Sequence, residues 1–262
     1  MVKEVVNVAI QDRLVTWLRL LSTELDARMP LTEKLDRYAA GYPDIPEHVK
    51  EIKAETEYRV LLRQAVTNWP ELIVESSAER MEVVGFEWGD EDLNETAWTA
   101  WEQCELDSNS NDLHEAMLTN GRAYALVWPT ADGGVTVTLE HASTTIVAYN
   151  TRTGEPEAAM RRWEDDGKWY ATLYLADGVY KFEGKDKSRP NPDGRSWVAR
   201  QVDGETWPLA NWAAPHIPVV EFQANSSLSG LASSADQCGG PRKVSRIFGA
   251  AHGDFERVLP IV

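Results

Sequence analysis

The sequence contains little cysteine and no long hydrophobic run, and both absences narrow the kind of protein that it can encode. Its two cysteines, Cys104 and Cys238, form no CxxC pattern and no disulfide framework, which suits a reducing compartment. No apolar stretch approaches the ~20 residues that a membrane span needs. The N-terminal residues include Lys3, Glu4 and Asp12 and contain no apolar signal core followed by a small-residue cleavage site. We therefore expect a protein that is soluble and cytoplasmic when made and has no membrane partner.

Positive charge is also scarce. The chain has 26 Lys and Arg residues against 42 Asp and Glu residues, which gives a formal net charge of -16. A chain this acidic is not held on a phosphate backbone by bulk electrostatics, although a weakly repelling surface suits DNA that must slide past it. Solubility is the other explanation for this charge, and both stay open. Hydrophobic residues at 43% and charged residues at 26% predict a globular protein with a sizeable core.

The sequence lacks the common motifs of catalysis and cofactor binding. It contains no GxSxG elbow, no Walker A loop and no GxGxxG. Its histidines are scattered, and none stands at metal-ligand spacing from another histidine or a cysteine. They are His48, His114, His141, His216 and His252. We predict a protein that is not an enzyme and has no catalytic, cofactor-binding or metal site.

Three local features that could suggest chemistry have simpler structural explanations. The acids of Asp90-Glu91-Asp92 fit the first turn of a helix, where carboxylates cap free N–H groups and complement the helix dipole. The run Glu164-Asp165-Asp166-Gly167 fits a solvated hairpin tip. Cys104 follows Trp101 in a helical stretch, so we expect it to be buried as a small apolar side chain.

The first 80 residues are predicted to be helical. Apolar residues recur there at spacings of three and four, which is the pattern of one helix face; they are Val6, Ile10, Leu14, Trp17, Leu18, Leu21 and Leu25. This pattern predicts a helix that runs to about Arg28 before Pro30 stops it, followed by a short helix that Thr32 caps. Further helical stretches are predicted from Pro46, over Tyr58–Val66 and over Leu72–Met81.

After residue 80 the pattern changes to a mixture of helices and strands. We predict a strand at Glu82–Trp88, a helix starting at Asp90 and a second helix across Asp112–Leu118 that Asn120-Gly121 ends. Turn signals such as Asp166-Gly167 then join a series of strands into an antiparallel meander with helices to one side. The predicted strands are Ala123–Trp128, Val135–Leu139, Thr145–Tyr149, Glu157–Trp163, Trp169–Leu175, Val179–Phe182, Trp197–Ala199, Thr206–Trp207 and an edge strand at Ile217–Phe222.

These patterns divide the chain into three parts and predict an α+β fold. Residues 1–80 form an N-terminal helical region, and residues 81–223 form a mixed domain of helices and antiparallel sheet. Residues 224–262 are rich in small residues and have no sustained period, so we expect an irregular tail.

Eleven tryptophans are many for this length, and indole rings favour cores with polar edges and protein interfaces. Trp98 and Trp101 fall on one helix face, and Trp128 ends a predicted strand. We predict that these three are core or subunit-contact residues. A carbohydrate- or protein-binding module is the alternative, and it predicts a solvent-facing row of tryptophans on one sheet face. A hydrolase would instead need a deep pocket with converging acids of shifted pKa.

The order and spacing of several segments resemble the portal proteins of long-tailed phages, particularly those of phages of actinobacteria. The resemblance covers about residues 30–222 and includes the helix that runs into a glycine-aromatic end and the long stretch that ends in Trp128. The similar segments are Leu35–Pro43, Asn68–Phe86, Trp101–Trp128, Glu140–Ser143, Val147–Asn150 and Ile217–Phe222.

This resemblance implies a structural role in the virion. Portal subunits form a homo-oligomeric ring, usually a dodecamer, at one capsid vertex, and double-stranded DNA passes through the ring. The implied partners are the terminase, scaffold or capsid proteins, and head–tail adaptor proteins. The matched part would be the wing region of the ring, and the implied locations are the virion and, during assembly, the host cytoplasm.

Family members continue for about as long again, with a stem, a clip and a crown, and residues 225–262 do not resemble a stem. We therefore expect a truncated copy of a portal protein with a non-native tail. We also expect the chain by itself to be a monomer or a weak oligomer.

Overall fold

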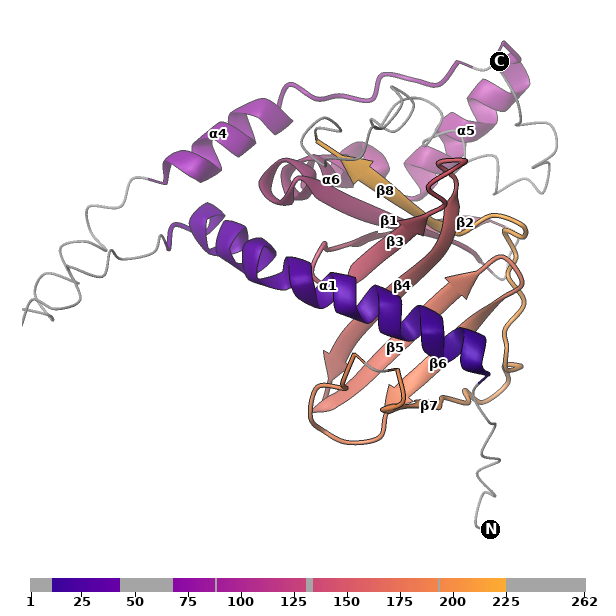
Figure 1. Ribbon diagram of the computed structural model, residues 1–262. Coiled ribbons are helices and arrows are strands. Elements are labelled where there is room, and N and C mark those ends of the chain that lie inside the picture. The colour runs from indigo at the N-terminus through magenta and orange to yellow at the C-terminus, as the bar shows by residue number, and fades with distance from the viewer. Residues whose placement is uncertain (1–10, 43–67, 88, 131–133, 193, 225–262) are drawn as a thin grey trace, which may run out of the picture.

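The computed structural model describes residues 11–42, 68–87, 89–130, 134–192 and 194–224 (Figure 1). The helices in this part are α1 (Asp12–Ala39), α4 (Trp69–Ala78), α5 (Glu91–Gln103) and α6 (Leu106–Asn120). The strands are β1 (Arg122–Pro129), β2 (Val135–Glu140), β3 (Thr145–Tyr149), β4 (Pro156–Asp165), β5 (Lys168–Leu175), β6 (Gly178–Gly184), β7 (Trp197–Ala199) and β8 (Val219–Gln223). The predicted α+β class is confirmed. The predicted helices within residues 43–67 and the tail from residue 225 lie outside the described residues.

The strands form two antiparallel sheets. One has three strands in the order β2-β1-β8, and the other has five in the order β3-β4-β5-β6-β7. The expected meander therefore continues only from β3 to β7, because the turn after β2 carries the chain from the first sheet into the second. The last strand lies at a sheet edge, as Pro218 just before it predicted.

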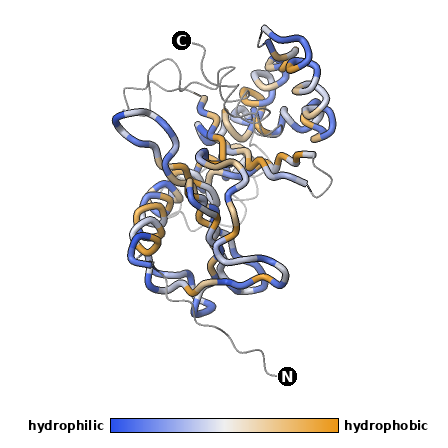
Figure 2. Tube along the Cα trace, turned by 90° about the vertical axis from the view of Figure 1, so that its right-hand side faces the viewer, coloured by the Kyte–Doolittle hydropathy of each residue, from blue (hydrophilic) through white to orange (hydrophobic). Residues whose placement is uncertain are grey.

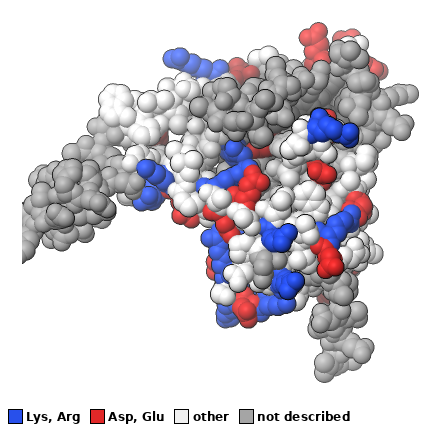
Figure 3. Space-filling model, viewed as in Figure 1, with Lys and Arg blue, Asp and Glu red and all other residues white. Residues whose placement is uncertain are grey.

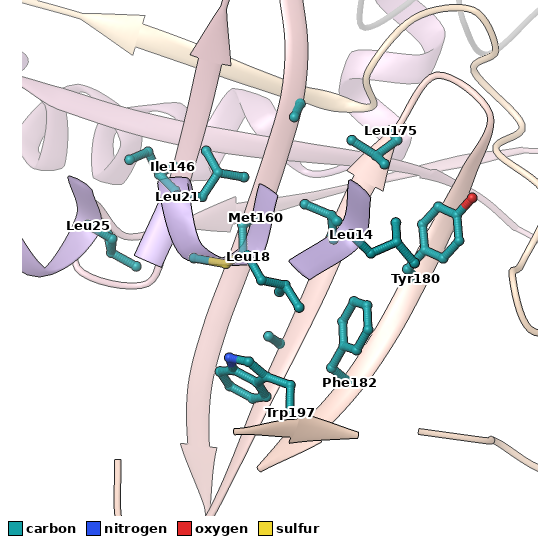
Figure 4. Packing of buried hydrophobic residues seen from close by; sticks show 13 residues of the cluster. Leu14, Leu18, Leu21, Leu25, Ile146, Met160, Leu175, Tyr180, Phe182 and Trp197 are labelled. Atoms are coloured by element: carbon teal, nitrogen blue, oxygen red, sulfur yellow. The ribbon is translucent and has the colours of Figure 1, made fainter. Parts of the chain in front are cut away.

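Helix α1 lies across one face of the five-stranded sheet, and this contact forms an extensive apolar core. Leu14, Leu18, Leu21 and Leu25 are 0% exposed, and burial of each stabilises the fold by roughly 1.5–3 kcal/mol. Figure 4 shows these leucines pointing at the sheet. Apolar and polar residues alternate along α1, which is at the lower left of Figure 2. The sheet side of this core comprises Ile146, Ala158, Met160, Ala171, Leu173, Leu175, Tyr180, Phe182 and Trp197.

Pro30 lies inside α1 and does not end it, so the predicted break at this residue is wrong. A proline in a helix interior lacks the N–H that bonds to the carbonyl four residues earlier, at a cost of about 3 kcal/mol. Packing on both sides of the proline offsets this cost, because Leu25 before it and Thr32 after it are buried. Near the end of α1, Asp36 accepts a hydrogen bond of 2.9 Å from Asn120 of α6. Thr32 is thus a buried helical residue and not the cap of a second helix.

Two predicted strands are absent from the described part of the chain. The predicted strand Glu82–Trp88 has no regular structure in its described residues and joins neither sheet. Its apolar residues Val83 and Phe86 pack against the helix α5 instead, so the alternating pattern reflects packing on a helix. Thr206–Trp207 is also no strand, and the Trp207 indole N–H donates to the backbone carbonyl of Lys181 at 2.9 Å.

Helix α5 begins, and helix α6 ends, at a residue type that predicts a helix boundary. The Asp90 side chain accepts hydrogen bonds from the backbone N–H groups of Asp92 (3.1 Å) and Leu93 (3.4 Å) at the start of α5. Gly121 ends α6 with a φ of 74°, a left-handed conformation that glycine adopts without a steric penalty. No helix in the described part is both long enough and apolar enough to cross a membrane.

A buried carboxylate connects the three-stranded sheet to helix α1. Glu221 of β8 is 2% exposed, and it accepts hydrogen bonds from Arg122 (3.1 Å) and from the Tyr124 hydroxyl (3.2 Å). Burial raises the pKa of Tyr124, which keeps the hydroxyl protonated as a donor. The Tyr124 oxygen in turn lies 3.5 Å from Arg28 of α1. The charge is therefore buried with partners, which avoids the large penalty of an unpaired one.

The leucine face of α1 gives a first prediction. Leu18→Ala removes a side chain that is 0% exposed and should lower the free energy of unfolding by roughly 2–5 kcal/mol. Leu20→Ala is the matched control, because Leu20 lies on the same helix and is 49% exposed. Urea unfolding of both variants measures the difference, and equal losses would contradict this description of the core.

The loop between β6 and β7 gives a second prediction. A Cβ added at Gly194 would lie 2.5 Å from the carbonyl oxygen of Val15 in α1, and the φ of Gly194 is +74°. Gly204 has a similar φ of +85° and nothing within 4 Å of such a Cβ. Both Gly→Ala variants carry the left-handed penalty of about 1–2 kcal/mol, so Gly194→Ala should lower the melting temperature further than Gly204→Ala.

Candidate contact surface

Trp98 and Trp101 of α5 lie together against Phe86. The ring centroid of Phe86 is 6.1 Å from that of Trp98 and 5.7 Å from that of Trp101, distances typical of packed aromatic clusters. Trp101 is 6% exposed, whereas Trp98 is half-buried. The indole N–H of Trp98 donates to Glu102 at 2.8 Å. Trp101 therefore lies in the core between α5 and the three-stranded sheet, and Trp98 lies at the edge of that core.

Trp128 is separate from this pair. It is half-buried on β1, and its ring makes an edge contact with Tyr174 of β5 at 6.5 Å between centroids. The surrounding cluster contains Tyr124 and Val219 from the three-stranded sheet and Val147 from the five-stranded sheet. Trp128 thus packs where the two sheets meet.

The outward end of the β4–β5 hairpin carries a ladder of two stacked aromatic rings with an arginine at each end. Trp163 and Tyr170 face each other across the strands and stack at 5.6 Å. The Arg161 guanidinium lies 4.6 Å from the Trp163 centroid, and that of Arg200 lies 4.5 Å from the Tyr170 centroid. Each ring thus has a ring partner and a cation partner within the protein.

This ladder bears on the carbohydrate-binding alternative. A sugar stacks on a free aromatic face, whereas the faces of Trp163 and Tyr170 are occupied by neighbouring side chains. Among the tryptophans in the described part, Trp69 alone is exposed, and it lies on helix α4. The solvent-facing tryptophan row that this alternative predicts is not formed by the described residues.

The acidic residues singled out in the sequence cap a helix or lie at a hairpin tip, and a further acid, Glu140, is paired with an arginine. Asp90 caps α5, and Asp166-Gly167 forms the β4–β5 hairpin tip with positive φ angles of 48° and 68°. Glu140 is buried, which raises its pKa, while an ion pair of 2.7 Å with Arg161 acts in the opposite direction. Within the described ranges, no three His, Cys, Asp or Glu side chains come together as a metal site.

Cys104 and the described histidines also take part in local contacts. The Cys104 thiol lies 3.2 Å from the carbonyl oxygen of Val135, and burial raises its pKa. His141 lies at the turn between the two sheets, where Ser143 (2.8 Å) and Asn120 (3.1 Å) are its partners. His48 and His252 lie outside the described residues.

Helix α4 presents an apolar stripe to solvent. Trp69 is 61% exposed, Leu72 is 52% exposed and Ile73 is 62% exposed, whereas Ala78 is the buried residue of this helix. Positions i, i+3 and i+4 lie on one helix face, so the three large side chains form one surface. In Figure 1, α4 lies at the upper left, away from the five-stranded sheet. In Figure 3 the surface over α4 is mainly uncharged on the side that faces the viewer.

Hydrogen bonds hold the start of this helix to the end of α1. Before α4, the Asn68 amide donates to the carbonyl of Ala39 at 2.7 Å and to Glu71 at 2.5 Å. Helix α4 also packs against α6. The exposed stripe therefore lies on a helix that is hydrogen-bonded to the end of α1 and packs against α6.

Sequence reasoning predicted the helix but missed the exposure of its apolar residues. The signal was present, because Leu72, Ile73 and Val74 are consecutive and a helix turns about 100° per residue. Three consecutive apolar residues cannot all face one neighbouring layer. The half-buried Val74 faces inward with Ala78, which leaves Leu72 and Ile73 outside.

A comparison with known protein families identifies the family to which the chain belongs. A family model described as "Phage portal protein, SPP1 Gp6-like" matches residues 18–236, more than four-fifths of the chain. The match includes the three predicted tryptophans and the exposed stripe of α4. No curated protein matches the sequence closely enough to be compared with it.

The buried histidine gives a third prediction. Burial lowers the pKa of His114 below its ordinary value. A histidine with a lowered folded-state pKa contributes stability that is present above its unfolded pKa of about 6.5 and is lost as the pH falls below that value. Wild-type protein should therefore lose more stability than His114→Gln between pH 7 and pH 5 in urea unfolding. Identical losses would contradict a neutral buried imidazole.

Proposed function

Because the chain belongs to the SPP1 Gp6-like family of phage portal proteins, we propose that it is a structural subunit of the ring through which phage DNA is packaged and ejected. The residues described here supply its wing-like part. The family match over residues 18–236 carries this proposal. The α+β architecture supports it, as does the exposed helix α4 within the N-terminal region, since such a helix is expected of a subunit isolated from its neighbours.

The family is a structural one, and we propose that this chain works by shape and has no catalytic activity. Polar groups in the described part serve packing: Asp90 caps a helix, Glu221 is paired inside a sheet, and Glu140 pairs with Arg161. These arrangements support a rigid scaffold.

The negative net charge of the chain suits a protein past which DNA slides without being bound tightly. A net charge of -16 disfavours tight binding to a phosphate backbone. The face shown in Figure 3 mixes acidic and basic side chains and has no extended basic stripe among its described residues. We propose that double-stranded DNA passes through the ring without being held by these residues.

Portal membership also defines the proposed partners and location. We propose further copies of the chain as ring neighbours, in a dodecamer as in the family. The other proposed partners are the terminase, scaffold or capsid proteins, and head–tail adaptor proteins. A portal subunit is a component of the virion, and we propose assembly in the host cytoplasm.

Immunoelectron microscopy of the phage that encodes this chain tests the proposal. An antibody against the chain should label one vertex of the head, because a single ring occupies a single vertex. An antibody against the major capsid protein is the control and should label the whole shell. Mass spectrometry of purified heads should detect the chain in far fewer copies than the capsid protein. Absence from heads, or labelling over the whole shell, would reject the portal role.

A further inference from the structure

We propose that Asp26, Arg162 and Arg189 form a binding site for a small oxyanion of the phosphate class, beside the contact between α1 and the five-stranded sheet. The three side chains come from α1, from β4 and from the loop between β6 and β7. They are called the Asp26 site below. The proposal goes beyond the portal role and does not depend on it.

Two arginines share one carboxylate in the Asp26 site. The guanidinium groups of Arg162 and Arg189 both donate hydrogen bonds to the same Asp26 oxygen, Oδ1. Both groups also lie over the ring of Trp169, at 5.9 Å and 5.7 Å from its centroid. Two cations against one carboxylate leave an excess of one positive charge. Because like charges repel at close range, this convergence favours the binding of a second anion.

The arginine of β4 has an unused donor. Arg162 is 3% exposed, and its Nη1 atom is buried without a hydrogen-bond partner in the described part of the chain. A buried donor that loses water and gains no acceptor destabilises a fold, and a charged donor does so more strongly. An oxygen atom of a bound anion supplies the missing acceptor.

Arg189 is the entrance to the site. Its side chain is 42% exposed, and exposed side chains change rotamer within nanoseconds, so Arg189 can turn aside and admit a ligand next to Arg162. The loop that carries it is held in place. Lys185 donates to the carbonyl of Arg195 at 2.7 Å, and Gly194 lies against the carbonyl of Val15 in α1. The position of the second guanidinium is therefore set before a ligand arrives.

The donor set fits an oxyanion and not a cation. A guanidinium group is a planar fork with five N–H donors, which matches the spacing of phosphate oxygens. The carboxylate of Asp26 is already engaged by two arginines, so it does not attract a metal ion. Residues 185–189 add three basic side chains and one acidic side chain to the surroundings. The local charge is thus positive although the whole chain is acidic.

The same charges favour a single phosphate over duplex DNA. A net charge of -16 repels a long polyanion. A small anion responds mainly to the charges within about 10 Å at 0.1 M salt, where the arginines are in excess. The buried Arg162 donor is also out of reach of a rigid duplex. The ligand of the Asp26 site is therefore a free phosphate-class ion.

Isothermal titration calorimetry of the complete chain with inorganic phosphate tests the site, with the ionic strength held constant by sodium chloride. The wild type should bind phosphate saturably. Arg189→Gln should weaken this binding at least about tenfold, because it removes a charged donor. Arg200→Gln is the matched control and should bind like the wild type. Arg200 is also an arginine on an aromatic ring, 4.5 Å from the Tyr170 centroid, and lies outside the site.

Asp26→Asn tests the charge argument in the opposite direction. It removes the competing carboxylate and leaves two arginines without an anion, so this variant should bind phosphate more tightly than the wild type. Its melting temperature should be lower than that of the wild type in chloride, and phosphate should restore it at equal ionic strength. An ion pair with a purely structural role predicts the lower melting temperature without the restoration by phosphate.

Four outcomes would overturn the proposal. They are a wild type that gives no saturable heat, Arg189→Gln binding like the wild type, Asp26→Asn binding phosphate no more tightly than the wild type, and a short DNA duplex binding more tightly than inorganic phosphate at the same phosphate concentration. None of them bears on the portal role, because labelling of one vertex of the head does not depend on the Asp26 site.

Discussion

The fold depends on the contact between the leucine face of α1 and the five-stranded sheet. Four leucines of this helix are fully buried against residues that come from all five strands. Because α1 and the sheet are more than 100 residues apart in sequence, this burial joins the N-terminal part of the chain to its middle. It also fixes the direction of α1. The direction of α1 in turn sets the positions of Asp36, which bonds to Asn120 of α6, and of Ala39, which bonds to Asn68 before α4. Close packing at this contact leaves room for no Cβ at Gly194, where the loop after β6 meets the helix.

Polar interactions also hold the sheets and α1 together. Glu221, Arg122 and Tyr124 fill the interior of the three-stranded sheet with paired groups, and Arg28 reaches them from α1. The ladder of Arg161, Trp163, Tyr170 and Arg200 stiffens the outward end of the hairpin, where little core is available. These interactions hold the three-stranded sheet, the hairpin and α1 in fixed positions.

Helix α4 is the exception to this pattern, and its exposure is informative for that reason. Elsewhere in the described part, large apolar side chains are mostly covered. On α4 they face solvent although the start of the helix is held to α1 by Asn68.

The sequence alone determined the fold class, the strands β1–β8, the start of α5 at Asp90, the end of α6 at Gly121 and the portal resemblance. These follow from local periodicity, turn residues and segment order. It failed at Pro30, where tertiary burial of Leu25 and Thr32 outweighs a local helix breaker, and at Glu82–Trp88, where an alternating pattern packs on a helix and pairs with no described strand. It placed Trp98, Trp101 and Trp128 among apolar neighbours but could not say which neighbours, since Phe86 and Tyr174 meet them only through long-range packing. The outward direction of Leu72 and Ile73 was likewise decided by the tertiary structure, because periodicity defines the faces of a helix and only the surrounding layers determine which face is covered.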